Sequence, residues 1–399
     1  MIYWIWLQLA LGQGSDRASL IREKFSSVRK VYESGDAGRA ASGVFNQREL
    51  RLLRDTPLSK AESILNKCTK ENISILTYDS NIYPEILRNI PDPPFVLYVK
   101  GRLPDFDNTP SICIVGPRKV TDYGYKCAYS LSGRLCRGGF LIVSGGAMGS
   151  DSAAHQGALL NGGKTVAVLA NGFGNNYLSQ NEELRQSILE NGCLITEYPP
   201  DTPVTKGAFH ARNRIMSGLC SGVIVVEAHE KSGTLITANR AVEQNRDLFV
   251  IPGNPGLPQY VASNKLIRDG AKPLIDLNDI FSEYNNKFYG KIDIEKAMSS
   301  PLAKMVRYAP TKSDTIKKQT QKFEKMPTKT EENKFIKKIL PENLSKNAKI
   351  IYNQLNKQIF TCDDLLSPTM NVSTIMSAIG ELELMGYIKS LPGGRYTFK

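Results

Sequence analysis

The stretch FLIVSGGAMGSDSAAHQGALLNGGKTVAVLA, residues 140–170, decides the fold of this chain. It begins and ends with short apolar runs, and between them lie a glycine-rich loop and a pattern of small residues with helical spacing. Parallel strands need a crossover between them, and that crossover is usually a helix. The stretch therefore predicts one strand–helix–strand unit of an α/β domain.

The same alternation continues on both sides of this stretch. Further strand-like runs are ISILTY (73–78), FVLYV (95–99), ICIVG (112–116), CLITE (193–197), GVIVVEA (222–228) and DLFVIPG (247–253). Helical patterns lie near residues 124–138, 151–161, 181–190, 212–219, 234–245 and 260–269. Strands that are apolar along their whole length are buried on both faces, so residues 70–285 predict a doubly wound, mostly parallel sheet.

Two further regions flank this domain. Residues 1–69 have helical spacing, and their opening MIYWIWLQLAL predicts a buried helix because it is too short to span a bilayer and lacks a basic start. The string LALGQGSDRA resembles a helix-hairpin-helix turn, although a plain structural turn is the favoured alternative. Residues 286–340 are rich in Lys, Thr and Gln, which predicts a flexible basic linker.

The last region, residues 341–399, predicts a winged helix. Helical patterns at 346–356, 361–366 and 371–385 precede two strands, YIKSL and RYTFK. A transcription regulator would read duplex DNA with the third helix, but NVSTIMSAIGELELM carries Glu381 and Glu383 and no Lys or Arg. We therefore expect this region to pack against a partner or against its own chain.

The distribution of charge matters more than the net charge of +12. Residues 286–340 hold 14 basic and 6 acidic side chains, whereas residues 70–285 are close to neutral, so local clusters must carry any argument for nucleic acid. The seven cysteines have no CxxC spacing and predict reduced, buried thiols of a cytoplasmic protein. The sequence contains no zinc-ligand spacing, P-loop or HExxH motif, and we expect no metal and no cofactor.

Four segments carry the candidate site residues. They are Gly116-Pro117-Arg118-Lys119, the loop from Ser144-Gly145 to Asp151, the segment 208–219 with Lys206 just upstream, and the segment from Glu227 to Thr234, in which Ser232-Gly233-Thr234 starts a helix and could hold a phosphate. In a doubly wound sheet, ligands bind at the carboxyl ends of the strands, where loops lead into helix N-termini that can hold phosphates. We expect the four segments to converge at that edge.

The third segment is the most informative of the four. AFHARNRIMSGL (208–219) places Arg212 and Arg214 on the first turn of a helix predicted to begin at residue 212, with Lys206 and Phe209 just upstream. Guanidinium forks, helix amides and an aromatic ring suit a polyanion with stackable bases, and this predicts single-stranded nucleic acid. The alternative is an ordinary helix whose arginines pair with carboxylates.

Asp151 and His155 are the candidate pair for general-base chemistry, because they lie one turn apart. The sequence places no nucleophile with them. We therefore favour Asp151 as the cap of the following helix and His155 as a packed helix residue.

Eight motifs occur in one order, and together they resemble the DNA-processing protein A family, also called DprA or Smf. The motifs are VGPRKVTDYG, IVSGGAMGSDSAAHQGAL, GGKTVAVLANG, TEYPPDTP, FHARNRIMSGL, VVEAHEKSGTLITA, VIPGNPGLP and NKLIRDGA. The resemblance implies a Rossmann-like domain, a sterile-alpha-motif-like N-terminal domain and a homodimer. It also implies a protein that binds single-stranded DNA without sequence preference, protects incoming DNA in natural transformation and loads RecA recombinase onto it.

Carried over by position, the family's DNA contacts fall on Arg118, Ser144, Gly145, Lys206, Phe209, Arg212, Asn213 and Arg214. This chain departs from the family at His210, where proline is usual, and at Met148, where an arginine is usual.

The alternative function is that of a nucleotide-binding enzyme. The LOG-like phosphoribohydrolases share the glycine-rich loop, but EKSGTLITA places Thr237 or its neighbour where those enzymes have a catalytic glutamate. We therefore expect a binding protein and not an enzyme.

Overall fold

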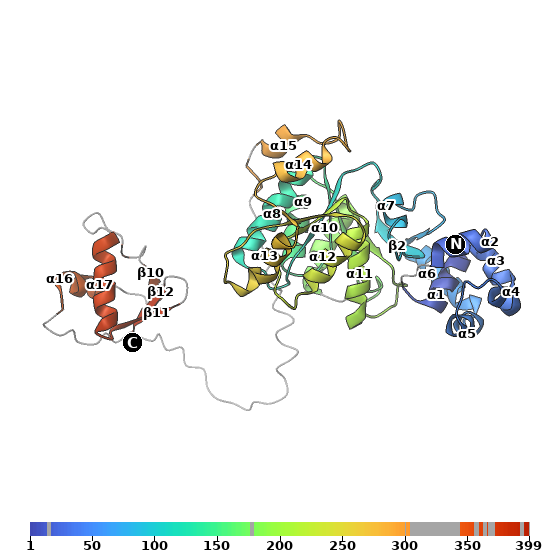
Figure 1. Cartoon of the computed structure of the whole chain (residues 1–399), viewed down its shortest axis with the longest axis horizontal. Coiled ribbons are helices and arrows are strands. Elements are labelled where there is room, and N and C mark those ends of the chain that lie inside the picture. The colour runs from blue at the N-terminus through green and yellow to red at the C-terminus, as the bar shows by residue number, and fades with distance from the viewer. Residues whose placement is uncertain are drawn as a thin grey trace, which may run out of the picture. The chain divides into compact units, whose positions relative to one another are not determined.

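The computed structural model describes residues 1–13, 17–175, 179–299, 301–303, 344–354, 359–361, 365, 372–391 and 395–398. The chain divides into two compact units, Met1–Lys312 and Ser313–Lys399, and Figure 1 labels some of the elements of each.

A nine-stranded sheet forms the centre of the first unit, with the order β1-β2-β6-β5-β4-β3-β7-β8-β9. The strands are β1 (Ser74–Thr77), β2 (Val96–Gly101), β3 (Ser111–Val115), β4 (Leu141–Ser144), β5 (Thr165–Leu169), β6 (Cys193–Thr196), β7 (Gly222–Val225), β8 (Asp247–Val250) and β9 (Lys272–Pro273). Neighbouring strands from β6 to β9 run parallel, while β1 and β2 pair antiparallel at one edge. The predicted doubly wound, mostly parallel sheet is confirmed.

Helices cover both faces of the sheet because successive strand residues point to opposite sides. Val143 and Val166 belong to the hydrophobic cluster that includes side chains of α11 (Lys206–Gly218) and α12 (Gly233–Glu243). On the opposite face, Ile142 packs in a second cluster. That cluster takes in α8 (Asp122–Arg137), α9 (Ser150–Leu160) and α14 (Asn278–Tyr284), while α10 (Glu182–Asn191) packs on Ala167. The remaining helices of this region are α7 (Glu85–Arg88) and α13 (Val261–Arg268).

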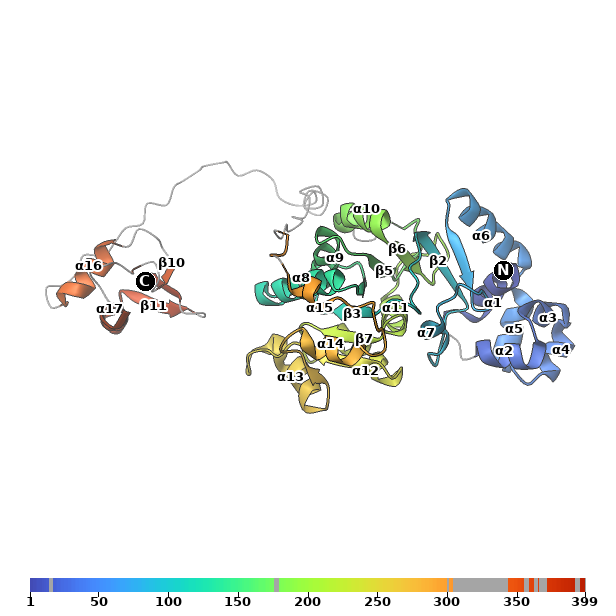
Figure 2. The ribbon, with the colours of Figure 1, turned by 90° about the horizontal axis from the view of Figure 1, so that it is seen from above.

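The N-terminal helices share their core with the sheet. They are α1 (Ile2–Leu11), α2 (Arg17–Phe25), α3 (Val28–Glu33), α4 (Gly35–Ala41), α5 (Gln47–Asp55) and α6 (Leu58–Lys70), and Figure 2 shows α1 and α6 beside β2. The Trp4 ring lies 5.7 Å from that of Phe95, and the Gln8 amide donates to the carbonyls of Val96 and Glu197. The buried helix predicted at the N-terminus is confirmed, while residues 14–16 of the glycine turn lie outside the described residues.

The linker predicted to begin at residue 286 is wrong for residues 286–303. Phe288 and Ala297 are buried, and Ala297 belongs to α15 (Ile294–Met298), which packs against α8. The Tyr129 hydroxyl donates to the Ala303 carbonyl at 2.8 Å. The segment is polar on average, so its composition did not reveal these few buried apolar side chains. Residues 304–340 lie outside the described residues.

The second unit contains the elements of a winged helix. They are α16 (Lys346–Gln354), β10 (Ile359–Thr361), α17 (Val372–Leu384), β11 (Ile388–Leu391) and β12 (Arg395–Phe398), with the sheet order β10-β12-β11. Thr361 ends β10, so the helix predicted at 361–366 does not begin there, and most of that range lies outside the described residues. The Glu381 carboxylate accepts hydrogen bonds from the N–H and the hydroxyl of Ser345. This contact gives a structural role to one of the two acidic residues of α17, the helix predicted to be the third of the winged helix.

None of the helices in the described part of the chain has the length and apolar character that crossing a bilayer requires. Among the same residues, no group of His, Cys, Asp and Glu side chains is arranged to hold a metal ion. Of the cysteines described, Cys127 is half-buried and the other five are buried, and all of them are unpaired thiols. Burial raises the pKa of the Cys136 thiol to about 12.

Candidate functional site

A cleft of about 370 Å³ opens at the carboxyl ends of β3, β4 and β7. The chain winds away from β3 in one direction through β4 and β5, and in the other through β7 and β8. Ligands of doubly wound sheets bind at such a switch point. The cleft is lined by Val115, Gly116, Pro117, Arg118, Ala147, Met148, Asp151, Lys206, Phe209, His210, Arg212, Asn213, Met216, Ser232, Gly233, Thr234 and Thr237. All four segments expected to converge do so.

Arg118 and Phe209 meet across the mouth of this cleft. Arg118 is exposed on the loop after β3, and its guanidinium carbon lies 4.8 Å from the centroid of the Phe209 ring. Phe209 is half-buried and packs against the apolar cluster of Ala170, Tyr198 and Ala208. Lys206, one turn earlier on the same helix, is exposed. Two cations and an aromatic ring therefore line the same cleft.

Helix α11 begins at Lys206 and not at residue 212, which corrects the predicted helix start. Its N-cap residue, Thr205, is of a type that often caps helices, but it makes no side-chain capping bond, and no acidic residue lies in the first turn. His210 lies inside the helix, where its backbone N–H can donate to the preceding turn, as a proline could not. The free amides of the first turn lie beside Lys206, whereas Arg212 and Arg214 lie in the second half of the helix.

Arg212 lines the cleft, but it is 6% exposed and already has partners. Its Nη1 donates to the carbonyls of Gly145 at 2.6 Å and Val168 at 2.5 Å. Burial lowers the pKa of the Arg212 guanidinium, and the nearby Asp151 carboxylate opposes that shift. Arg212 therefore joins the loop after β4 to the end of β5 and adds positive charge beneath the cleft.

Asp151 lies in the first turn of α9 and does not cap it, because the N-cap position is Gly149. Its carboxylate instead accepts the N–H of Ala147 at 3.2 Å and stabilises the preceding loop. Burial raises the pKa of Asp151, against the opposing effect of Arg212. The expected capping role is replaced by support of the glycine loop.

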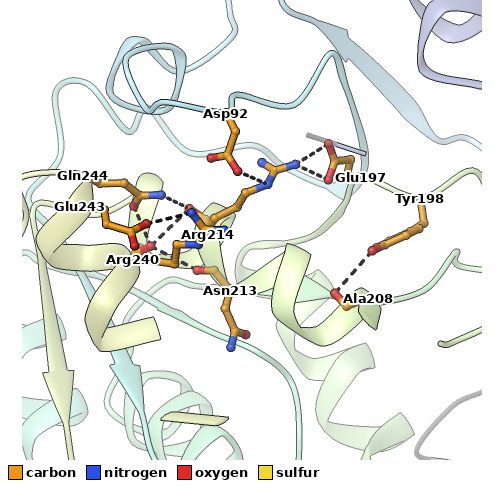
Figure 3. Close-up of polar contacts among 10 residues, drawn as sticks. Asp92, Glu197, Tyr198, Ala208, Asn213, Arg214, Arg240, Glu243 and Gln244 are labelled. Carbon is orange, nitrogen blue, oxygen red and sulfur yellow. Dashed lines mark hydrogen bonds and ion pairs between the residues drawn. The ribbon is translucent and has the colours of Figure 1, made fainter. Parts of the chain in front are cut away.

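Arg214 does not reach the cleft. Its side chain is 2% exposed, and Nη2 lies 2.6 Å from both carboxylate oxygens of Glu197, while Nε lies 3.5 Å from Asp92. Figure 3 shows the Arg214 side chain reaching toward these two carboxylates, while the neighbouring Asn213 side chain points the other way. Direct contact with a ligand, expected from the sequence, is therefore corrected to a bracing role between α11, β6 and the Asp92 loop.

Ser144 and Gly145 also lie beneath the cleft surface. The Ser144 hydroxyl is fully buried and donates to the Ile114 carbonyl at 2.7 Å. A Cβ atom on Gly145 would lie 2.2 Å from Nη1 of Arg212, so glycine is needed there for close approach. Direct contact by these two residues is not supported, because both are buried by their own neighbours.

His155 is separate from the site. It is fully buried in α9, and its Nδ1 lies 2.7 Å from the Thr165 hydroxyl. Burial lowers its pKa to about 3, and the charge of Arg212 contributes to this shift. The preferred interpretation as a packed helix residue is confirmed, and Asp151 and His155 have different partners.

The comparisons with known proteins agree with this geometry. The family described as DNA recombination-mediator protein A matches residues 74–285. Protein Smf of Synechocystis is 33% identical over 83% of this chain and 82% of its own length, and the DNA processing protein DprA of Bacillus subtilis is 40% identical over 56% and 75%. This chain belongs to the DNA recombination-mediator protein A family.

Two solved structures of this family are similar to the chain. DprA of Streptococcus pneumoniae has a TM-score of 0.62 at 32% identity, covering 71% of this chain and 98% of its own. The DprA of Helicobacter pylori, whose structure was described for its single-stranded DNA binding mode, has a TM-score of 0.50 at 29% identity. It covers 54% of this chain and 97% of its own.

The anchoring of the loop that carries Arg118 is a feature of the site that the sequence did not reveal. Glu227, fully buried after β7, accepts the N–H of Thr121 at 3.1 Å, the hydroxyl of Thr121, and that of Tyr260 at 3.0 Å. Thr121 in turn caps α8. Lys119 on this loop is exposed but does not line the cleft. No local motif signals this network, since Glu227 and Thr121 are 106 residues apart.

Proposed function

We propose that this chain binds single-stranded DNA, without sequence preference, in the cleft at the carboxyl edge of the sheet. The observation that carries the proposal is the convergence of Arg118, Lys206 and Phe209 on one cleft, from two segments far apart in the sequence. The Helicobacter pylori relative, described for its single-stranded DNA binding mode, supports it.

The chemistry of the lining residues suits an unpaired strand. Arg118 and Lys206 would hold phosphates, and the N-terminus of α12 at Ser232-Gly233-Thr234 offers a further site for one. Phe209 would stack a base, and stacking of this kind accepts any base because every base has a flat face. Base pairs inside a duplex are stacked on both sides, so the ring selects unpaired strands.

Salt dependence of binding tests this assignment. We expect Arg118→Ala and Lys206→Ala each to lower the slope of log affinity against log salt by about 0.7, because each removes one phosphate contact on a single strand. Phe209→Ala should weaken oligo-dT binding by about 1–3 kcal/mol with little change in slope. Lys287→Ala, an exposed cation away from the cleft, is the control. Binding of wild type that is independent of salt would contradict the proposal.

We further propose the wider role that the family suggests: a homodimer that protects incoming single strands in natural transformation and passes them to RecA. The family description as a DNA recombination mediator supports a role in recombination. Light scattering on the full chain tests the dimer. Assembly of RecA on strands pre-coated with a single-strand binding protein, with and without this chain, tests the transfer.

We propose that the cleft binds and does not catalyse. By the sequence resemblance, Thr237 or its neighbour stands where phosphoribohydrolases have their glutamate; Thr237 lines the cleft, and Asp151 already accepts a loop amide. Incubation with AMP is expected to release no adenine. Release of adenine at a rate that depends on Asp151 would favour the phosphoribohydrolase alternative instead.

A further inference from the structure

The ring that should receive a base already has an occupant. The Arg118 guanidinium lies over Phe209 at 4.8 Å from the ring centroid, which is within the range of a cation–π contact. The same ring packs against Ala170, Tyr198 and Ala208, and it is only half-exposed. A base cannot stack on the face that Arg118 covers while the guanidinium remains there.

Arg118 can leave the ring without any change in the fold of its loop. The backbone of the loop is held at both ends. The Arg118 carbonyl packs so closely on Gly149 that a Cβ there would lie 2.4 Å away, and Thr121 is bound to Glu227. The side chain itself is exposed, and rotation about its own bonds moves the guanidinium without moving the loop backbone.

We propose that Arg118 covers the Phe209 ring in the free protein, and that a strand enters by exchange: a base takes the ring while the guanidinium turns to a neighbouring phosphate. This inference rests on the proposed function and names the ligand class more closely. A ligand that has phosphates but no bases must draw Arg118 off the Phe209 ring, and no base then stacks on the ring to replace the lost cation–π contact. A ligand that has bases but no charged phosphates must displace the Arg118 guanidinium without offering it a phosphate to bind. The cleft therefore selects ligands that carry both groups, and it discriminates against polyanions that lack bases.

Two half-ligands separate the parts of this exchange. One is an abasic oligonucleotide, which keeps the charged backbone and lacks bases, and the other is a methylphosphonate oligo-dT, which keeps the bases and lacks the charge. Phe209→Leu should tighten binding of the abasic strand about two- to fivefold, since Arg118 no longer has a ring to leave. Arg118→Ala should tighten binding of the uncharged oligo-dT by a similar factor, about two- to fivefold, because the ring is no longer covered.

The controls use the same two probes. In an Arg118→Ala background, Phe209→Leu should leave abasic binding unchanged. Lys287→Ala removes a matched cation, which lies 5.5 Å from the centroid of Phe288 outside the cleft, and should change neither affinity. Each variant is first checked for an unchanged urea midpoint.

The outcomes distinguish the exchange from the proposed function. If either half-ligand binds its variant no more tightly than it binds wild type, the exchange is refuted. A weaker complex of the uncharged oligo-dT with Arg118→Ala would show instead that the guanidinium stacks on the bound base. Ordinary oligo-dT is measured beside the probes, and failure of wild type to bind it would refute the proposed function as well.

Discussion

Arg118 and Arg214 are both arginines of predicted contact motifs, yet their surroundings give them opposite tasks. Arg118 is exposed and faces the cleft, whereas Arg214 is 2% exposed and bound to a carboxylate that is itself 1% exposed. Removing either partner of a buried ion pair destabilises the fold, because the charge that remains is held out of water without its counter-ion. The contribution of each arginine can therefore be separated by experiment.

We expect Arg214→Ala to lower the free energy of unfolding by about 3–5 kcal/mol, because it removes the guanidinium that binds the buried Glu197 carboxylate. Arg118→Ala should change it by less than about 0.5 kcal/mol, since its side chain is exposed. Urea denaturation followed by circular dichroism measures both. An Arg214→Ala protein of wild-type stability that has lost DNA binding would show that Arg214 is a direct contact after all.

His155 makes the stability of the domain depend on pH. Its pKa falls from the ordinary 6.5 to about 3 in the folded chain, so below pH 6.5 the unfolded chain takes up a proton that the folded chain does not. Stability is therefore complete above pH 6.5 and falls as the pH drops toward 3, by up to about 1.4 kcal/mol per pH unit. We expect His155→Gln to remove this part of the slope between pH 6 and pH 4.5.

His210→Gln is the matched control for that measurement, because His210 is exposed on α11. Its urea midpoints should follow those of wild type across the same pH range. A slope in His155→Gln equal to that of wild type would contradict the assignment.

At the scale of elements, the glycine loop between β4 and α9 holds the cleft in shape. Gly145 lies against both Arg212 and Asp151, which brings the loop next to α11. We expect Gly145→Ala to lower the free energy of unfolding by about 1–3 kcal/mol, because its Cβ would lie 2.6 Å from Oδ2 of Asp151 and even closer to Arg212.

Gly207→Ala is the control for this substitution. Gly207 lies near the start of α11 with no atom within 4 Å of an added Cβ, so alanine should leave stability unchanged or raise it by up to about 1 kcal/mol. Thermal unfolding compares the two variants. Equal melting temperatures for both would show that the loop tolerates a side chain at Gly145.

The elements themselves were largely predictable, because apolar strands and helical spacing are local properties. The start of α11 was not, since no acidic residue follows Thr205 in the first turn, and the helix begins six residues before the predicted position. Burial of Arg214 was also hidden, because Glu197 is the residue just after β6 and Asp92 comes from a loop more than a hundred residues earlier. Charge alone cannot tell a phosphate ligand from one half of a buried ion pair.

At the scale of the whole molecule, the sequence predicted the order of regions better than their boundaries. The N-terminal helices share a core with the sheet through Trp4 and Gln8, and α15 packs on α8 although the composition around it is that of a linker. Both differences arise because a few apolar side chains decide packing, while composition averages over many polar ones. The cleft itself depends on the parallel sheet, which brings distant loops to one edge.

The central claim is that this edge holds an unpaired strand by its phosphates and one stacked base. Fluorescence anisotropy with single-stranded and double-stranded oligonucleotides of equal length, at two salt concentrations, tests it most directly. We predict tighter binding of the single strand at both concentrations, with affinity that falls as salt rises. Equal or tighter binding of the duplex, or affinity for the single strand that does not change with salt, would contradict the account.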